Sequence, residues 1–189
     1  MARARTGVRV IAGSAKGRRL DTPGGDTTRP ITDRVKESVF GALEPILPGA
    51  RVLDLYAGSG AMAIEALSRG AASATLVEKD PRVVEVIASN VSRVGVEPQT
   101  TIVKADVLVH LARATATEFD VVFLDPPYAA PTSDVERAMA ALGAGWLAPR
   151  ATVVVRRQKR STHPVPPPGL EFTRIREYGD TVVLVAQTH

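Results

Sequence analysis

The residues Asp125-Pro126-Pro127-Tyr128 stand where the apolar run Phe119–Leu124 opens into a polar segment. Such a run is typical of a buried strand, so the four residues should lie in the loop at its carboxyl end. A carboxylate and a proline carbonyl, held by two rings that fix the backbone, offer two rigid hydrogen-bond acceptors. Tyr128 adds a ring that can stack on a base, an interaction worth about 1–3 kcal/mol. The pattern predicts a site for a planar amine, with Asp125, Pro126 and Tyr128 as catalytic residues.

The same four residues can also form an ordinary turn, because Asp and Pro are common turn residues and Tyr often ends a strand. A second pattern favours the functional interpretation. Residues 51–60 predict a short apolar strand and a Gly-rich turn, and residues 61–69 predict a helix. This is the first half of a nucleotide-binding βαβ unit, in which Gly58 and Gly60 allow positive φ angles and close approach of a ligand.

Four successive predicted strands end in an acidic residue, namely Asp54, Glu78, Asp106 and Asp125. Ligands of open parallel sheets bind beyond the carboxyl ends of the strands, so the four carboxylates should meet in one crevice. Glu78 follows the glycine turn by about 20 residues, the position of an acid that accepts hydrogen bonds from a ribose. For any single acid, a solvated strand end or a helix cap is the better explanation, as at Asp106, but this explanation is improbable for four acids in series.

Residues 58–63 also fit the loose dinucleotide pattern G-x-G-x-x-A, which would indicate a nicotinamide enzyme. Asp54 argues against it, because a carboxylate beside the turn would repel a pyrophosphate and attract an ammonium group. S-adenosylmethionine carries an ammonium, a sulfonium, a ribose and an adenine, and is the predicted cofactor. The predicted cofactor site comprises Asp54, Tyr56, Gly58, Gly60, Glu78, Lys79 and Asp106.

The chain resembles the class I S-adenosylmethionine-dependent methyltransferases, and among them the bacterial family that methylates the 2-amino group of a guanine in 16S ribosomal RNA. The matching stretches are residues 29–40, 54–60, 77–80 and 125–128, in the order of the family. The resemblance implies a Rossmann-like fold and, as partner, 16S rRNA or the small ribosomal subunit. The guanine would leave its stack, with its amino group held by Asp125 and the Pro126 carbonyl.

Asp-Pro-Pro-Tyr is shared with enzymes that methylate adenine or cytosine amines, so an adenine amino-methyltransferase acting on DNA or RNA is an alternative. A non-catalytic RNA-binding module on the same fold is another. The stretch of residues 29–40 favours the guanine family, and a chain of 189 residues leaves no room for a recognisable DNA target-reading domain.

Basic residues gather at the start of the chain. Residues 1–36 hold nine Lys and Arg against three acidic residues, a net charge of +6, whereas the whole chain carries +4. A basic arm on a mildly acidic body is the footprint expected for nucleic acid. Residues 156–160 predict a second basic patch. The predicted RNA-binding residues are Arg18, Arg19, Arg29, Arg34 and Lys36.

Composition predicts a compact enzyme, with 44% hydrophobic and 23% charged residues. No stretch approaches the roughly 20 apolar residues of a membrane span, and the Arg-rich start lacks the apolar region of a secretion signal. We therefore expect a cytoplasmic protein, and a monomer. The chain has no cysteine, and His110, His163 and His189 lack metal-ligand spacing, so no metal site is expected.

The predicted fold class is α/β, a seven-stranded doubly wound sheet with an antiparallel last strand and an N-terminal hairpin and helix. The sequence predicts a hairpin over residues 8–21 and a helix over 32–43. Strands and helices then alternate at 51–56, 59–69, 73–78, 81–94, 100–104, 107–112, 119–124 and 133–142, before strands at 151–156, 170–177 and 181–187. We expect residues 1–44 to contact RNA and residues 45–189 to form the catalytic domain.

Overall fold

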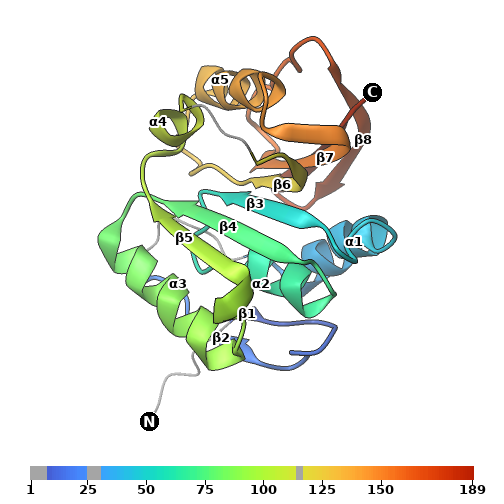
Figure 1. Ribbon diagram of the computed structural model, residues 1–189. Coiled ribbons are helices and arrows are strands. Elements are labelled where there is room, and N and C mark those ends of the chain that lie inside the picture. Colours follow the sequence, from blue (N-terminus) through green and yellow to red (C-terminus); the bar gives the residue numbers. More distant parts are fainter. Residues whose placement is uncertain (1–7, 25–30, 114–116) are drawn as a thin grey trace.

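A single twisted sheet forms the centre of the molecule in the computed structural model, which describes residues 8–24, 31–113 and 117–189. The strands of this sheet lie in the order β5-β4-β3-β6-β7-β9-β8. The first five are mutually parallel, and β9 is antiparallel to both β7 and β8. The predicted seven-stranded sheet with an antiparallel last strand is confirmed (Figure 1).

The elements follow the predicted order, and most begin and end within two residues of the expected positions. The strands are β1 (Val8–Arg9), β2 (Arg19–Leu20), β3 (Arg51–Leu55), β4 (Ser73–Glu78), β5 (Thr100–Lys104), β6 (Phe119–Leu124), β7 (Leu147–Gln158), β8 (Leu170–Tyr178) and β9 (Thr181–Thr188). The helices are α1 (Asp33–Leu43), α2 (Ala61–Ser68), α3 (Pro81–Val94), α4 (Val107–Leu111) and α5 (Thr132–Gly143), with a 3₁₀ turn, η1, at Glu97–Gln99.

Helices cover both faces of the sheet, with α1, α2 and α3 on one side and α4 and α5 on the other (Figure 1). The strands supply both cores, because successive side chains point to opposite faces. In β6, Val121 and Phe123 join the cluster under α1 and α2, whereas Val122 and Leu124 join the cluster under α5. Continuous apolar strands such as β6 are therefore buried on both sides, as expected in a parallel sheet.

Strand β7 is the element that the sequence predicted least well, since it begins at Leu147 rather than at residue 151. The pairing with β6 shifts between Phe119, which faces Leu147, and Val121, which faces Thr152. Pro149 lies in this irregular part, and Arg150 has a φ angle of 61°. Proline and residues in the left-handed region are uncommon within strands, so the sequence does not predict that the strand begins before them.

The N-terminal hairpin is fastened to α2. Gly13 has a φ angle of 85°, and a Cβ atom there would lie 1.8 Å from the carbonyl oxygen of Ser68, so only glycine fits. The carboxylate of Glu65 accepts hydrogen bonds from the backbone N–H groups of Ile11 (2.8 Å) and Ala12 (3.0 Å). Hydrophobic residues of the hairpin, α1, α2 and β3 share one core cluster. The predicted division into an RNA-contacting segment, residues 1–44, and a catalytic domain, residues 45–189, therefore stays a prediction about function.

Lys36 corrects the predicted RNA interface. Its side chain is fully buried, with the ammonium 2.8 Å from the Glu65 carboxylate and 2.7 Å from the Arg9 carbonyl. Burial lowers the pKa of Lys36, although Glu65 opposes the change. Burial also acts to raise the pKa of Glu65, but Lys36 and the other donors outweigh it, so the carboxyl pKa is lowered. The prediction that Lys36 contacts RNA is wrong, because its ammonium group is buried in the core and paired there with the Glu65 carboxylate.

No helix within the described ranges is long and apolar enough to cross a membrane.

The buried ion pair predicts an unequal response to removal of its two partners. Glu65→Ala should lower the free energy of unfolding by about 3–5 kcal/mol, because it strands the Lys36 ammonium in the core. Lys36→Met should cost less, because Glu65 keeps the Nε–H of Arg69 at 2.9 Å and two backbone donors. Urea unfolding measures both changes. Glu85→Ala, at an exposed position of α3, is the control and should stay within about 0.5 kcal/mol of the parent. Similar losses for Glu65→Ala and Glu85→Ala would contradict this account.

Candidate active site

The site lies at the carboxyl edge of the three central strands, and strand register fixes its geometry. Leu55 at the end of β3 pairs with Val77 of β4 and with Leu124 of β6. The next residue along each strand is therefore level with the others, which puts Tyr56, Glu78 and Asp125 at one edge. The pairing continues past the strands, with the Asp125 N–H 3.4 Å from the Leu55 carbonyl oxygen.

Asp54 lies within β3, one residue before Leu55, and is buried below this edge, with 2% of its surface exposed. Its Oδ2 atom accepts a hydrogen bond from the Ala63 N–H at 3.1 Å, which ties β3 to the first turn of α2. Burial raises the pKa of Asp54 well above its usual value, and the nearby carboxylates of Asp125 and Glu78 raise it further. The structure therefore brings Asp54, Glu78 and Asp125 within electrostatic reach of one another.

The two glycines of the turn, Gly58 and Gly60, have different structural roles. Gly60, with a φ angle of 76°, caps α2, and a Cβ atom there would lie 3.0 Å from the Leu76 side chain. Its place is thus fixed by packing against β4. Gly58 has a φ angle of 57° and no close neighbour at its Cβ position, and its N–H donates to Glu78 Oε2 at 3.2 Å. Only the Gly58 side of the turn has the open approach that a ligand needs.

Glu78 is held by backbone donors. Besides the Gly58 N–H, the N–H groups of Lys79 (2.8 Å) and Asp80 (3.0 Å) donate to its Oε1 atom. Lys79 is exposed, and its contact with Glu78 is made by its backbone N–H and not by its side chain. Asp106 caps α4, because its Oδ1 atom accepts from the N–H groups of Leu108 and Val109. The helix-cap interpretation of Asp106 therefore holds, and its contact with a ligand stays a prediction.

Tyr56 has a strained backbone, with a φ angle of 61° in a residue that is not glycine. Such outliers cluster at functional sites, where the surrounding structure holds them in place. Burial raises the pKa of Tyr56 to about 12, and the carboxylates of Asp106 and Asp134 add to the rise. The hydroxyl therefore stays protonated near neutral pH, beside Asp106.

Asp125 forms an ion pair with Arg156, which the sequence analysis assigned to a basic patch over residues 156–160. Arg156 Nε donates to Asp125 Oδ1 at 2.7 Å, and Nη2 lies 2.6 Å from Oδ2, a bidentate pair. Burial opposes the charge on Arg156, but Asp125 outweighs it and raises the arginine pKa. Leu124 faces Val155 in the β6–β7 pairing, so Arg156 is level with Asp125. The β6–β7 register could have predicted this pair, because Asp125 and Arg156 directly follow the paired residues Leu124 and Val155.

The predicted basic patch of residues 156–160 is therefore wrong in its first half. Arg157 is 4% exposed, and its guanidinium donates to the Ala130 carbonyl (3.1 Å) and the Thr132 hydroxyl (3.4 Å). Burial lowers the pKa of Arg157. Lys159 is exposed and pairs with Glu177 at 2.6 Å. Arg156 and Arg157 therefore hold the segment that follows β6, through Asp125 and through Ala130 and Thr132.

Arg156, the partner of Asp125, lines a pocket of about 290 Å³, which is called the acceptor pocket below. Its walls include Tyr128, Arg156, Val35 and Tyr178. The Pro127 carbonyl accepts a hydrogen bond from the Ala130 N–H at 2.9 Å, so the loop turns back on itself after Pro126. Pro126 itself is buried, and the role of its carbonyl as the second acceptor stays a prediction.

Asn90 is a site residue that the sequence analysis missed. Its side chain is fully buried and donates to the carbonyls of Ser59 (2.9 Å) in the glycine turn and Asp21 (2.8 Å) after the hairpin. It also accepts the Asp21 N–H at 2.8 Å. A polar residue on the inner face of a helix was the available signal. Asn90 makes the position of the turn depend on that of the hairpin.

The predicted RNA residues are dispersed. Arg18, Arg19 and Arg34 are exposed, and Arg18 Nη1 donates to the Arg93 carbonyl at 3.4 Å. Arg29 lies outside the described residues. Contact of these side chains with RNA stays a prediction.

The hydrogen-bond acceptors at the edge fit S-adenosylmethionine chemically. Three carboxylates share a partly dehydrated edge beside a glycine turn, which favours a ligand that brings positive charge and hydroxyl donors. Across the described part of the chain, no group of three or more His, Cys, Asp or Glu side chains is arranged to hold a metal ion.

Comparisons with known proteins agree on one family. The family described as "Conserved hypothetical protein 95" matches residues 8–187. Ribosomal RNA small subunit methyltransferase D of Escherichia coli strain K12 is 34% identical over 181 residues, which cover 95% of this chain and 89% of the relative. The solved structure of Escherichia coli yhhF has a TM-score of 0.87 and 32% identity, over 97% of this chain and 98% of that one.

A more distant structure identifies the fold. An RNA methyltransferase from Salinibacter ruber, solved in complex with S-adenosyl-L-homocysteine, has a TM-score of 0.64 at 19% identity, over 85% of this chain and 94% of that one. The architecture is that of the class I methyltransferases, as the sequence predicted.

The buried carboxyl of Asp54 predicts a pH-dependent stability. Because its pKa is raised on folding, its contribution is complete below the unfolded value of about 3.9 and is lost as the pH rises through the folded value. Asp54→Asn cannot ionise, and its amide oxygen can still accept from Ala63. The variant should therefore gain stability relative to the parent as the pH rises above about 4. Denaturant unfolding of both proteins over a pH series tests this, and parallel pH curves would contradict it.

Proposed function

We propose, since this chain belongs to the "Conserved hypothetical protein 95" family, that it methylates the 2-amino group of a guanine in the 16S ribosomal RNA of the small subunit, with S-adenosylmethionine as methyl donor. Its relatives include enzymes named ribosomal RNA small subunit methyltransferase D. The observation that carries the proposal is the fixed Asp125 carboxylate, held by Arg156 at the same strand edge as Glu78 and the glycine turn.

The cofactor half of the site would be formed by the edge of β3, β4 and β5. Bound S-adenosylmethionine supplies a methyl group on a sulfonium, ready for transfer to a nucleophile. Glu78 would accept hydrogen bonds from ribose hydroxyls, and its three backbone donors hold the carboxylate in position for this. Asp54 and the Gly58 side of the turn would balance the ammonium end, and Asp106 would accept from the adenine amine.

The acceptor half would be the loop after β6. An exocyclic guanine amine is a weak nucleophile, because its lone pair is delocalised into the ring. Asp125 and the Pro126 carbonyl would each accept one amine proton, which fixes the nitrogen and favours its tetrahedral geometry. Arg156 keeps the carboxylate from rotating, since both of its oxygens receive an N–H. Tyr128 would stack on the ring in the acceptor pocket.

Orientation would provide most of the rate enhancement. Holding two reactants in line can contribute about 7–11 kcal/mol, which requires that the acceptors stay fixed before the substrate arrives. The Asp125–Arg156 pair meets this requirement within the protein alone. Asp125 need not remove a proton before the transfer, because a nitrogen with four bonds loses one readily afterwards.

Methyl transfer to isolated subunits tests the proposal. Small subunits from a strain that lacks this protein should accept label from methyl-labelled S-adenosylmethionine, and nuclease mapping should find the label on the 2-amino group of one guanine. Label on an adenine would support the adenine amino-methyltransferase instead. Binding of subunits without any transfer would support a non-catalytic module, and either result contradicts the proposal.

Asp125 and Glu78 should fail in opposite ways. Asp125→Ala, with Asp125→Asn as the variant of equal size, should lower kcat by about a hundredfold or more and change cofactor affinity little. Glu78→Ala should weaken cofactor binding about tenfold or more, because charge-assisted hydrogen bonds are lost. Isothermal titration with S-adenosylhomocysteine and single-turnover transfer separate the two effects. Glu85→Ala is the matched control for Glu78. If Asp125→Asn lost cofactor affinity to the same degree as activity, its assigned role would be wrong.

A further inference from the structure

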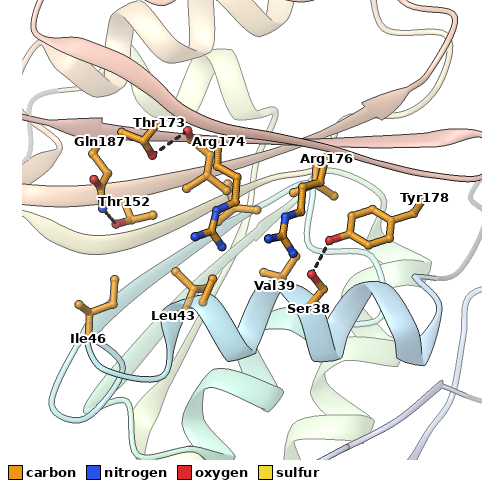
Figure 2. A pocket seen from close by; sticks show the side chains of 14 residues that line it. Ser38, Val39, Leu43, Ile46, Thr152, Thr173, Arg174, Arg176, Tyr178 and Gln187 are labelled. Atoms are coloured by element: carbon orange, nitrogen blue, oxygen red, sulfur yellow. Dashed lines mark hydrogen bonds between the residues drawn. The ribbon is translucent and has the colours of Figure 1, made fainter.

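A second hollow lies on the α1 side of the sheet, between α1 and the strands β7, β9 and β8 (Figure 2). We call it the α1–β8 groove. Its volume is about 290 Å³, close to the lower end of ligand sites, at about 300 Å³. Apolar side chains of both layers contribute to it, among them Val39 and Leu43 of α1 and Val154 and Val185 of the sheet. The proposed methyl-transfer chemistry uses none of these residues.

Two arginines of the edge strand β8 give the groove its charge. Arg174 and Arg176 are exposed, and their guanidinium groups extend over the groove toward α1 (Figure 2). Neither has a hydrogen bond or an ion pair with any residue that the structure describes, unlike Arg156 and Arg157. No carboxylate lines the groove. An anionic partner would therefore meet two uncompensated positive charges.

A β-bulge directs both arginines to this face. Phe172 pairs with Ala186 of β9, but the next paired residue is Arg174, opposite Val185, so Thr173 is inserted. Phe172 packs against the cluster on the α4 and α5 side, and strict alternation would put Arg174 there too. The extra residue reverses the alternation, which turns Arg174 and Arg176 toward α1.

The groove and the acceptor pocket share one wall residue. Tyr178 lines both, and its hydroxyl is hydrogen-bonded to that of Ser38 on α1 where the two meet (Figure 2). A chain that leaves the acceptor pocket past Tyr178 would pass Arg176 first and Arg174 next. Alternate residues of a strand are about 6.6 Å apart. This spacing is comparable with the advance of one nucleotide along an extended single strand.

We infer that the α1–β8 groove binds the RNA strand next to the target nucleotide, with consecutive phosphates paired to Arg176 and Arg174 and a ribose or base over the apolar floor. The inference rests on the proposed function and extends it to a second RNA contact, made by the edge strand β8. The unpaired guanidinium groups favour RNA over an apolar protein segment. Such contacts orient the substrate without selecting its sequence.

Salt-dependent binding to small subunits tests the groove. Arg174→Ala and Arg176→Ala should each weaken binding about threefold to tenfold, and each should reduce the slope of log Kd against log salt concentration by about 1. Arg113→Ala is the control, because it removes one exposed positive charge after α4, on the opposite face. Filter binding with enzyme loaded with S-adenosylhomocysteine measures Kd. Affinity for S-adenosylhomocysteine should be unchanged in all three variants.

Parallel measurements separate the groove from the proposed function. Absence of methyl transfer by the parent protein would overturn the proposed function, and with it this inference. If the parent is active and the groove variants behave as Arg113→Ala does, the groove inference alone is overturned. It is also overturned if the variants bind intact subunits weakly but bind deproteinised 16S RNA as the parent does, because the partner would then be a ribosomal protein.

Discussion

Negative charge collected at one sheet edge is the constraint on which the site depends. The register of β3, β4 and β6 puts Glu78 and Asp125 on either side of the end of β3, which carries the buried Asp54, and both carboxylates add to the burial that raises the pKa of Asp54. The protein compensates the outer two differently. Backbone N–H groups solvate Glu78, and the rigid fork of Arg156 neutralises Asp125. Among the described residues, Asp54 accepts one N–H, that of Ala63, and it is the carboxyl group whose pKa is raised. The glycine turn and the bidentate pair are thus two solutions to one electrostatic problem.

The same edge is connected to the N-terminal segment by buried polar groups. Glu65 of α2 receives Lys36, Arg69 and two backbone N–H groups of the hairpin, so that one carboxylate joins three elements. Asn90 of α3 then links the residue that follows the hairpin, Asp21, with Ser59 in the glycine turn. A buried network of this kind is stable only when every member is satisfied. The described hairpin is therefore held in a fixed orientation relative to the turn, which suits a substrate that must be positioned against a cofactor.

The sequence predicted the elements well because local rules and tertiary packing agree. Thr32 and Asp80 cap α1 and α3 as expected, and apolar runs such as that of β6 became central strands. The acids at strand ends were predictable because parallel strands share one carboxyl edge. What could not be predicted depends on pairing across the sheet. The partner of Asp125 is set by the β6–β7 register, the burial of Lys36 by the packing of α1 on α2, and the bulge in β8 by a single inserted residue.

Residue type alone therefore gives a poor map of an RNA-binding surface. Lys36, Arg156 and Arg157 belong to basic segments of the sequence, yet each is bonded to a carboxylate or carbonyl of the protein. Arg174 and Arg176 lie in a strand with alternating charges, which suggests a solvated edge, yet they have no partner among the described residues and share one groove. An arginine whose hydrogen bonds are already made stabilises the fold, whereas one that lacks them, beside an apolar floor, can bind an external anion. The proposed RNA contacts of the α1–β8 groove rest on this difference in compensation and not on the local density of positive charge.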